Sequence, residues 1–253
     1  MSALEGRTAL VTGAGTGIGQ AIAWDLSAAG ARVILSGRRR EPLEATAARI
    51  TNCEIVTADM VDPDSMQTLA DTVLASGGVD ILINNAGFSS KIRSARHIGA
   101  QEWRDVMDVN TLGPAMLTRA LLSNMAERKH GDVVLISSMA AIRPNVMAGA
   151  VYSAAKAAAR AYMDVLYQEV REEGVRCVTV FPGEVDTPIL DNRALPPDAD
   201  TRALMMQPED IAAAVLMAVS LPRRANVTEI AIGATYPRDM SADVAAAKER
   251  TKL

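Results

Sequence analysis

The stretch "ALVTGAGTGIGQAIAWDLSAAGA", residues 9–31, decides the fold. It joins a short apolar run to a segment with helical spacing, and glycine stands at every second position between them, from Gly13 to Gly19. A glycine-rich turn that follows a strand and opens a helix is where a doubly wound sheet binds the phosphates of a nucleotide. Residues without side chains let a pyrophosphate approach the backbone N–H groups at the helix start, where the partial charge is positive. The stretch therefore predicts a nucleotide-binding turn, with a plain glycine-rich turn as the alternative.

The alternation of short apolar runs and helical segments continues along the chain. Later runs are "RVILSG", "EIVTA", "DILINNAG", "DVVLISS", "RCVTVFPG" and "EIAIGA", and residues 154–174 have clear helical spacing. Because the runs are apolar throughout, they predict a parallel sheet with helices on both faces. Gly30 and Gly174 stand where helices should end. We expect residues 1–253 to form one α/β domain, with a substrate loop around residues 188–208.

Composition excludes several classes of partner and site. The net charge of -4 gives no general attraction to nucleic acid. No apolar run approaches the roughly 20 residues that cross a bilayer, and the N-terminus lacks the pattern of a signal peptide, so we expect a cytoplasmic protein that does not bind membranes. Cys53 and Cys177 lie far apart in apolar contexts and are expected to be core thiols. His97 and His130 stand alone among polar residues, so we expect them to be solvated and expect no metal site.

Five further motifs extend the glycine signal. The ordinary dinucleotide fingerprint read from Gly13 needs glycine at position 18, where Ile18 stands, so the pattern here is T-G-x-x-x-G-x-G. It is followed in order by "NNAG" at 84–87, "DVNTLG", "LISS", "YSAAK" at 152–156 and "PGEVDT" at 182–187. From about residue 5 to about residue 190 the chain resembles the short-chain dehydrogenase/reductase family. The resemblance implies a Rossmann-like, doubly wound sheet of seven strands, a nicotinamide cofactor, oxidoreductase activity on a small molecule, and a homodimer or homotetramer.

Two residues of "YSAAK" can act together. Tyr152 and Lys156 are four positions apart and share one face of a helix. A nearby ammonium favours the phenolate, so we expect Lys156 to draw the pKa of Tyr152 towards neutrality and make it a general acid and base. Ser138 ends an apolar strand and can bond the substrate oxygen, with Ser137 as its rival. The resemblance further implies that Lys156 holds the nicotinamide ribose, and that Asn110 anchors a water chain from Lys156, with backbone bonding inside a helix as the alternative for Asn110.

The second strand indicates which nicotinamide cofactor binds. It ends "ILSGRRRE", with Gly37 where NAD-specific sites place an acid. Arg38 and Arg39 follow, and a guanidinium pairs with a 2′-phosphate, so we predict NADP(H) in preference to NAD(H), which remains possible. The alternative is a solvated helix start. The resemblance places Asp59 on the adenine, but Asp59 could equally cap a helix that begins near Pro63. The residues expected to line the cofactor are Thr12, Gly13, Thr16, Gly17, Ile18, Gly19, Arg38, Arg39, Asp59, Met60, Asn85, Ala86, Gly87, Tyr152, Lys156, Pro182, Gly183, Val185 and Thr187.

Substrate selection should lie in the segment after Ser138 and in the loop around residues 188–208. These segments supply apolar candidates, namely Ile142, Val146, Met147, Leu190, Leu195, Met205 and Met206. Arg143 is the one nearby charge that could receive a carboxylate, although a surface position is the alternative. We expect interconversion of a carbonyl and a secondary alcohol, on a small hydroxy acid or alcohol. The alternatives are a 3-oxoacyl thioester reductase and a non-catalytic nucleotide-sensing protein on the same fold.

Overall fold

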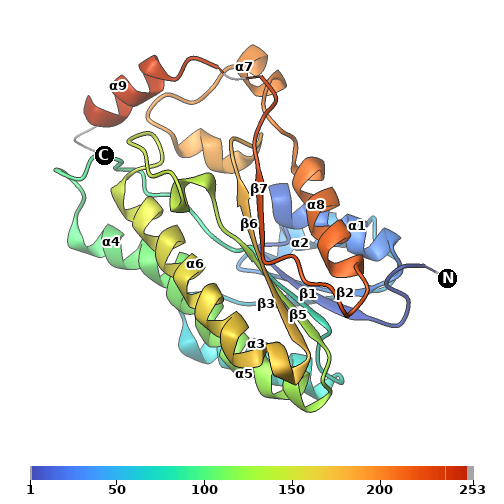
Figure 1. Ribbon diagram of the computed structural model, residues 1–253. Coiled ribbons are helices and arrows are strands. Elements are labelled where there is room, and N and C mark those ends of the chain that lie inside the picture. The colour runs from blue at the N-terminus through green and yellow to red at the C-terminus, as the bar shows by residue number, and fades with distance from the viewer. Residues whose placement is uncertain (1, 237, 250–253) are drawn as a thin grey trace.

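The structure is a computed structural model that describes residues 2–236 and 238–249. Its strands form one parallel sheet in the order β3-β2-β1-β4-β5-β6-β7 (Figure 1). The strands are β1 (Thr8–Thr12), β2 (Arg32–Gly37), β3 (Cys53–Thr57), β4 (Ile81–Asn84), β5 (Gly131–Ile136), β6 (Val175–Pro182) and β7 (Glu229–Ile232). The order reverses between β1 and β4. The predicted doubly wound, seven-stranded sheet is confirmed.

Helices cover both faces of this sheet. The α-helices of the described residues are α1 (Gly17–Ala28), α2 (Arg40–Ala47), α3 (Pro63–Ala75), α4 (Ala100–Met107), α5 (Gly113–Glu127), α6 (Ala150–Val170), α7 (Ala199–Ala203), α8 (Pro208–Ser220) and α9 (Ser241–Glu249). In Figure 1, α1, α2 and α8 lie on one side of the strands, and α3, α5 and α6 lie on the other. No helix within residues 2–236 and 238–249 combines the length and the hydropathy needed to span a membrane.

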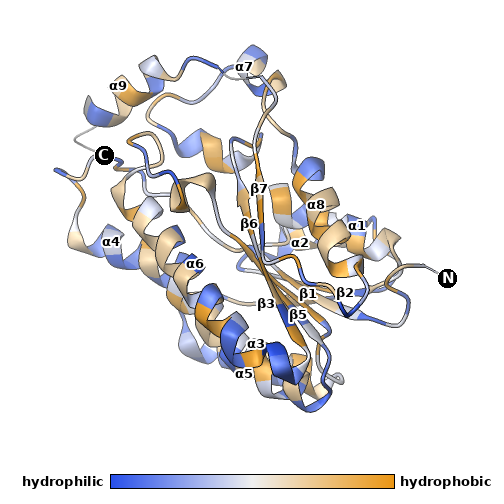
Figure 2. Cartoon of the chain, in the orientation of Figure 1, coloured by the Kyte–Doolittle hydropathy of each residue, from blue (hydrophilic) through white to orange (hydrophobic). Residues whose placement is uncertain are grey.

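The position of the strands between two layers of helices explains why their sequences are apolar throughout. Ala9 and Val11 pack into the core beneath α1 and α8, whereas Leu10, between them, packs into the core beneath α3, α5 and α6. Successive side chains of a strand point to opposite faces, so a sheet covered on both sides needs apolar residues at every position. Figure 2 shows hydrophobic residues concentrated along the central strands. The two expected helix-ending glycines are confirmed, because Gly30 and Gly174 have φ of 98° and 75°.

The expected excursion near residues 188–208 is a closed loop. It leaves the sheet after β6 through a 3₁₀ turn at Pro188–Asn192, contains the short helix α7, and returns at α8. A β-bridge between Val185 and Met206 closes its base. The lack of a clear period in this stretch hid α7, which has only five residues.

Two expectations about isolated residues need correction. Cys177 is buried in β6 as predicted, but Cys53 at the start of β3 is only half-buried. His97 is exposed, whereas His130 is half-buried after α5 rather than solvated. Burial, assisted by the charges of Arg223 and Arg7, lowers the pKa of His130. Within residues 2–236 and 238–249, no group of His, Cys, Asp or Glu side chains is arranged to hold a metal ion.

Candidate active site

A cleft lies at the carboxyl ends of the strands, where such sheets place their ligands. Its larger part has a volume of about 510 Å³ and is walled by the turn after β1, the segment after β4, the end of β5, the start of α6 and the segment after β6. A smaller hollow of about 160 Å³ lies against the ends of β2 and β3. Both parts share Gly13, Thr16, Ala86 and Gly87, so they form one groove across the edge of the sheet.

The turn after β1 is rich in glycine because its backbone adopts left-handed φ values and passes close to neighbouring segments. Gly13 and Gly17 have φ of 64° and 56°, the left-handed region that residues with side chains rarely adopt. A Cβ on Gly17 would lie 3.0 Å from Cγ2 of Thr187, so this glycine lets the two walls of the groove approach each other. A Cβ on Gly19 would clash with the carbonyl oxygen of Gly13 and the side chain of Asn85. Gly19 lines neither part of the groove, so here it serves the packing of α1.

Thr12 ties the first strand to the "NNAG" segment. Its Oγ1 accepts hydrogen bonds from the backbone N–H groups of Asn85 at 3.0 Å and Ala86 at 3.1 Å, and donates one to the carbonyl of Ile83 at 3.0 Å. Asn85 returns a bond from Nδ2 to the carbonyl of Thr12 at 2.9 Å. Thr12 is buried and shapes the wall that Asn85, Ala86 and Gly87 present to the groove.

Three predicted catalytic side chains meet in the larger part of the cleft. Ser138 lies one residue after Ser137, which follows β5, and its Oγ caps a 3₁₀ turn by accepting the N–H of Ala140 at 3.1 Å; its side chain is near enough to Tyr152 on α6 to act on the pKa of the phenol. Lys156 lies one turn further along α6 and donates a hydrogen bond from Nζ to the carbonyl of Ile136 at 2.9 Å. Ser137 instead directs its Oγ to the carbonyl of Lys156 at 3.3 Å. The geometry favours Ser138 over Ser137 as the partner of the tyrosine.

The electrostatics of this group differ from the simple expectation. Burial raises the pKa of Tyr152, while its hydrogen bond with Ser138 and the charges of Arg93 and Arg193 act in the opposite direction. Nζ of Lys156 lies 5.7 Å from the centroid of the Tyr152 ring and is held by the Ile136 carbonyl. The prediction that Lys156 draws the pKa of Tyr152 down is therefore wrong for this structure. Burial acts on Lys156 itself and lowers its pKa to about 8.

Asn110 lies in a π-helical turn, Asp108–Leu112, between α4 and α5. Its Nδ2 donates to the carbonyls of Phe88 at 2.9 Å and Val106 at 2.8 Å, so the backbone bonding that we gave as the alternative is present. Its Oδ1 is buried and has no hydrogen-bond partner among the described residues. A Cβ built on Gly87 would lie 2.6 Å from this oxygen and 3.3 Å from Nζ of Lys156, so the two groups converge on the same point. The amide thus holds the loop and still offers an acceptor beside Lys156.

The smaller hollow contains the residues predicted for the adenosine end. Arg38, Arg39, Asp59 and Met60 all line it. Arg39 also occupies the N-cap position of α2, without a capping hydrogen bond from its side chain, so part of the alternative of a helix start holds as well. The side chain of Asp59 accepts a bond from the N–H of Val61 at 3.2 Å and does not cap the helix that begins at Pro63. That role belongs to Asp62, so the capping alternative for Asp59 is wrong.

The far end of the cleft holds both predicted and missed residues. The predicted residues Pro182, Gly183, Val185 and Thr187 line it, as do Met147, Leu190 and Met205. Ile142, Arg143, Val146, Leu195 and Met206 do not, and Arg143 is exposed. Sequence reasoning missed Arg93, Glu184, Arg193 and Arg238, which also line this end. These four come from distant segments and have no shared spacing, so the sequence held no signal for them beyond the position of Glu184 inside "PGEVDT".

A Rossmann-like sheet whose switch point carries a glycine turn, joined to a serine, tyrosine and lysine in one cleft, defines the class of dinucleotide-dependent oxidoreductases. Comparison with known proteins makes the assignment specific. A family model of short chain dehydrogenases matches residues 7–197. An uncharacterised oxidoreductase of Staphylococcus aureus is 35% identical over 237 residues, which cover 92% of this chain and 99% of the relative.

Solved structures agree with this assignment. A metagenomic short-chain oxidoreductase in complex with NADP is 31% identical, with a TM-score of 0.81 over 93% of this chain and 100% of that one. A serine dehydrogenase complexed with NADP+ is 29% identical, with a TM-score of 0.83 over 89% and 94% of the two chains. A 3-ketoacyl-(acyl-carrier-protein) reductase from Brucella melitensis complexed with NADH is 26% identical, with a TM-score of 0.82 over 90% and 97%. This chain belongs to the short-chain dehydrogenase family and is an NAD(P)-dependent oxidoreductase.

Proposed function

We propose that the protein interconverts a carbonyl and a secondary alcohol on a small hydroxy acid or alcohol, with NADP(H) preferred, and that Ser138, Tyr152, Lys156 and Asn110 carry the reaction. The observation that supports this most directly is that Ser138, Tyr152 and Lys156 line one wall of the larger cavity, with Ser138 near enough to Tyr152 to act on the pKa of its phenol. Among the described residues that line the smaller part of the groove, no serine, tyrosine and lysine come together in this way.

A nicotinamide cofactor fits the groove. The left-handed turn at Gly13 and Gly17 brings the first turn of α1 to the groove, and Thr16, Gly17 and Ile18 face it there. The buried, unpaired Oδ1 of Asn110 beside Lys156 marks the other end as a polar site. Residues at "NNAG", Pro182, Gly183, Val185 and Thr187 would hold the cofactor along the groove. When bound, the cofactor supplies or accepts the hydride.

The protein residues handle the proton and the developing charge. In reduction, Tyr152 donates its phenolic proton to the substrate oxygen, and its raised pKa keeps that proton available at neutral pH. Ser138, which lines the same cavity as Tyr152, stabilises the oxygen as negative charge builds on it. Lys156 places an ammonium beside Tyr152 and Gly87, and Asn110 offers Oδ1 to a proton path from Lys156. In oxidation the same steps run in reverse.

Turnover of a carbonyl panel tests this proposal. Tyr152→Phe should lower kcat/KM about 100- to 10,000-fold, the range that a general acid contributes. Tyr162→Phe is a matched control on the same helix, because Tyr162 bonds the Ala115 carbonyl and lies outside the cleft. NADPH binding without turnover of any carbonyl would favour the nucleotide-sensing alternative. Turnover restricted to acyl thioesters would favour the 3-oxoacyl thioester reductase, an activity named for the Brucella relative.

The preference for NADP(H) rests on Arg38 and Arg39 in the smaller hollow, with Gly37 in place of an acid. Three solved neighbours that are named with NADP or a derivative of it support the same preference, while the Brucella reductase is named with NADH. Arg38→Ala should weaken NADPH binding about tenfold or more and change NADH binding little, because only the 2′-phosphate engages the guanidinium. Arg40→Ala is the control, since Arg40 pairs with Glu44 at 2.8 Å and does not line the hollow. Equal losses of both cofactors in Arg38→Ala would contradict the assignment.

We further propose a homodimer or homotetramer, as is usual in the family. Light scattering on the purified protein would measure this directly, and a monomeric mass would refute it.

A further inference from the structure

Exposed apolar side chains gather around the substrate end of the larger cavity. Of the large hydrophobic side chains that the described residues expose, Leu204, Tyr236 and Met240 line this cavity, and they are 55%, 71% and 42% exposed. Lys156 lines the same cavity and is 4% exposed. The cavity therefore runs from a buried reacting end to an exposed apolar rim, the name we give to Leu204, Tyr236 and Met240. Apolar side chains clustered at the mouth of a cavity are typical of a ligand-binding surface.

Two separate segments carry the apolar rim. Leu204 follows α7 in the loop around residues 188–208, whereas Tyr236 and Met240 lie between β7 and α9. In the second segment the residues at every other position line the cavity, namely Ala234, Tyr236, Arg238 and Met240. One side of this C-terminal segment is thus a wall of the cavity.

The two acids of "PGEVDT" hold these two segments in place. Glu184 accepts hydrogen bonds from Arg238 at 2.7 and 2.8 Å, and so ties the C-terminal segment to the segment after β6. Asp186 accepts a bond from Arg202 of α7 at 2.7 Å, two residues before Leu204. Each half of the apolar rim is therefore anchored to the segment after β6, which also lines the reacting end of the cavity.

An apolar rim on the same cavity as the reacting end is suited to one substrate chemistry. The carbonyl oxygen belongs beside Tyr152 and Ser138, so the rest of the substrate extends along the lining towards the rim. An apolar chain that covers the rim removes apolar surface from water on both sides, which is favourable. A charged group at the same place would lose its hydration against Leu204 and Met240, which cannot bond it. The rim therefore favours an uncharged, apolar chain.

We propose that the substrate is a neutral ketone or secondary alcohol with an apolar chain, and that the apolar rim binds the far end of that chain. This inference rests on the proposed function and selects the alcohol over the hydroxy acid as its substrate class. The rim residues determine specificity, while proton transfer stays with Tyr152. Glu184 and Asp186 are positioning residues that act through the segments they hold.

Binding of unbranched primary amides to the protein saturated with NADPH provides the first test, because an amide presents a carbonyl oxygen that NADPH does not reduce. From butanamide to octanamide, the Kd measured by calorimetry should fall about two- to fourfold for each added methylene. Octanamide whose terminal methyl is replaced by a carboxylate should bind at least about tenfold more weakly than octanamide. Equal Kd values along the series would overturn the inference. Tighter binding of the carboxylate, as expected if Arg193 or Arg238 received it, would overturn it as well.

Substitutions at the apolar rim provide the second test. Met240→Gln keeps the length of the side chain but makes its end polar, so it should weaken octanamide binding about three- to tenfold and leave butanamide binding unchanged. Leu204→Gln should do the same from the other segment. The matched control is Met217→Gln, because Met217 is 47% exposed on α8 and lies outside the cavity lining. NADPH affinity equal to that of the wild type shows that each variant is folded. A wild-type Kd for octanamide in both rim variants would overturn the inference.

Reduction of 2-alkanones separates this inference from the proposed function. In the wild type kcat/KM should rise from 2-butanone to 2-octanone, and the rise should be smaller in Met240→Gln and Leu204→Gln. Turnover that does not depend on chain length would overturn the inference and leave the proposed function intact. A wild type that binds NADPH and reduces no carbonyl would overturn both.

Discussion

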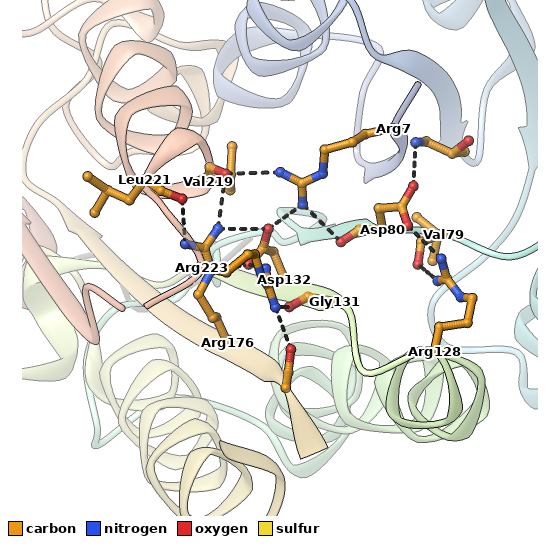
Figure 3. A network of polar contacts seen from close by, with 12 residues as sticks. Arg7, Val79, Asp80, Arg128, Gly131, Asp132, Arg176, Val219, Leu221 and Arg223 are labelled. Atoms are coloured by element: carbon orange, nitrogen blue, oxygen red, sulfur yellow. Dashed lines mark hydrogen bonds and ion pairs between the residues drawn. The ribbon is translucent and has the colours of Figure 1, made fainter. Parts of the chain in front are cut away.

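The substitution Asp132→Asn should lower the free energy of unfolding of the protein. Asp132 lies at the edge of the sheet opposite the cleft. Asp132 is 1% exposed and lies near the start of β5, where it joins three arginines (Figure 3). Arg176 donates to it from Nε at 2.6 Å and Nη2 at 3.1 Å, Arg223 donates from Nη1 at 2.9 Å, and Arg7 also pairs with it. Burial alone would raise the pKa of Asp132, but the bonds and charges of Arg176 and Arg7 hold it below its usual value.

The size of the effect follows from these contacts. Asparagine is neutral and keeps one acceptor oxygen, so all three guanidiniums lose the negative charge and at least one faces an N–H₂ group in place of its acceptor. Breaking a buried pair by removing one partner costs about 3–5 kcal/mol. Arg223 is 35% exposed and can turn to water, so we expect the lower end, about 3 kcal/mol. For a chain of this length each kcal/mol lowers Tm by about 2–4 °C, which gives roughly 6–12 °C.

Thermal unfolding at one fixed protein concentration measures this shift. Glu44→Gln is the matched control, because the Arg40–Glu44 pair is exposed on both sides and should contribute less than about 1 kcal/mol. NADPH affinity measured well below Tm should be unchanged in both variants, because the cleft lies at the other end of β5, about 17 Å from Asp132 along the strand. A Tm shift in Asp132→Asn no larger than that in Glu44→Gln would refute the reasoning that the buried carboxylate is needed to hold these three arginines together.

Two further predictions concern the cleft itself. Glu184→Gln should raise KM for the substrate about tenfold and speed tryptic cleavage after Arg193 and Arg238, because Glu184 holds both arginines in place. The control Glu54→Gln should leave the cleavage rate at these arginines unchanged. An unchanged cleavage rate in Glu184→Gln would contradict the prediction. Lys156, whose pKa burial lowers to about 8 from 10.5, should give an NMR signal that titrates near pH 8 and that is absent from Lys156→Met. Between about pH 8 and 10.5 the amine of Lys156 is neutral in the folded protein and protonated in the unfolded chain, so unfolding takes up a proton. The free energy of unfolding of the wild type relative to Lys156→Met should therefore rise by up to about 3 kcal/mol across that window. No relative change would refute the assignment.

Most of the fold could be predicted from local patterns in the sequence. The β-strand runs are apolar at every position because both faces of the sheet are covered, and the glycine turn needs φ values that only glycine adopts readily. Both signals depend on neighbouring residues, so the sequence displays them directly. The N-cap of α3 also had a local signal, since Asp62 stands immediately before a proline at the first helical position. This local signal favours Asp62 over the capping alternative for Asp59.

The charged lining of the cleft could not be read in the same way. Glu184 and Arg238 are 54 positions apart and come together only because the segment after β6 and the C-terminal segment meet above the sheet. The spacing of Tyr152 and Lys156 placed them correctly on one helical face, yet it could not show that Nζ bonds the Ile136 carbonyl of β5. The helical spacing sets which side chains are neighbours, whereas tertiary contacts set their charges and directions.

The two edges of the sheet place their arginines differently, and the difference separates stability from specificity. At the amino edge three arginines converge on Asp132, and Arg128 pairs with Asp80 at 2.6 Å, so each carboxylate is enclosed by its cations (Figure 3). At the carboxyl edge the arginines that line the cleft outnumber the one carboxylate there. The guanidiniums at the amino edge are already bonded to a carboxylate and to backbone carbonyls, so they fix the strands, whereas arginines that line a cavity can contact an anion that enters it. Substitutions at the first edge should therefore change Tm with little effect on substrate choice, and substitutions at the second should do the reverse.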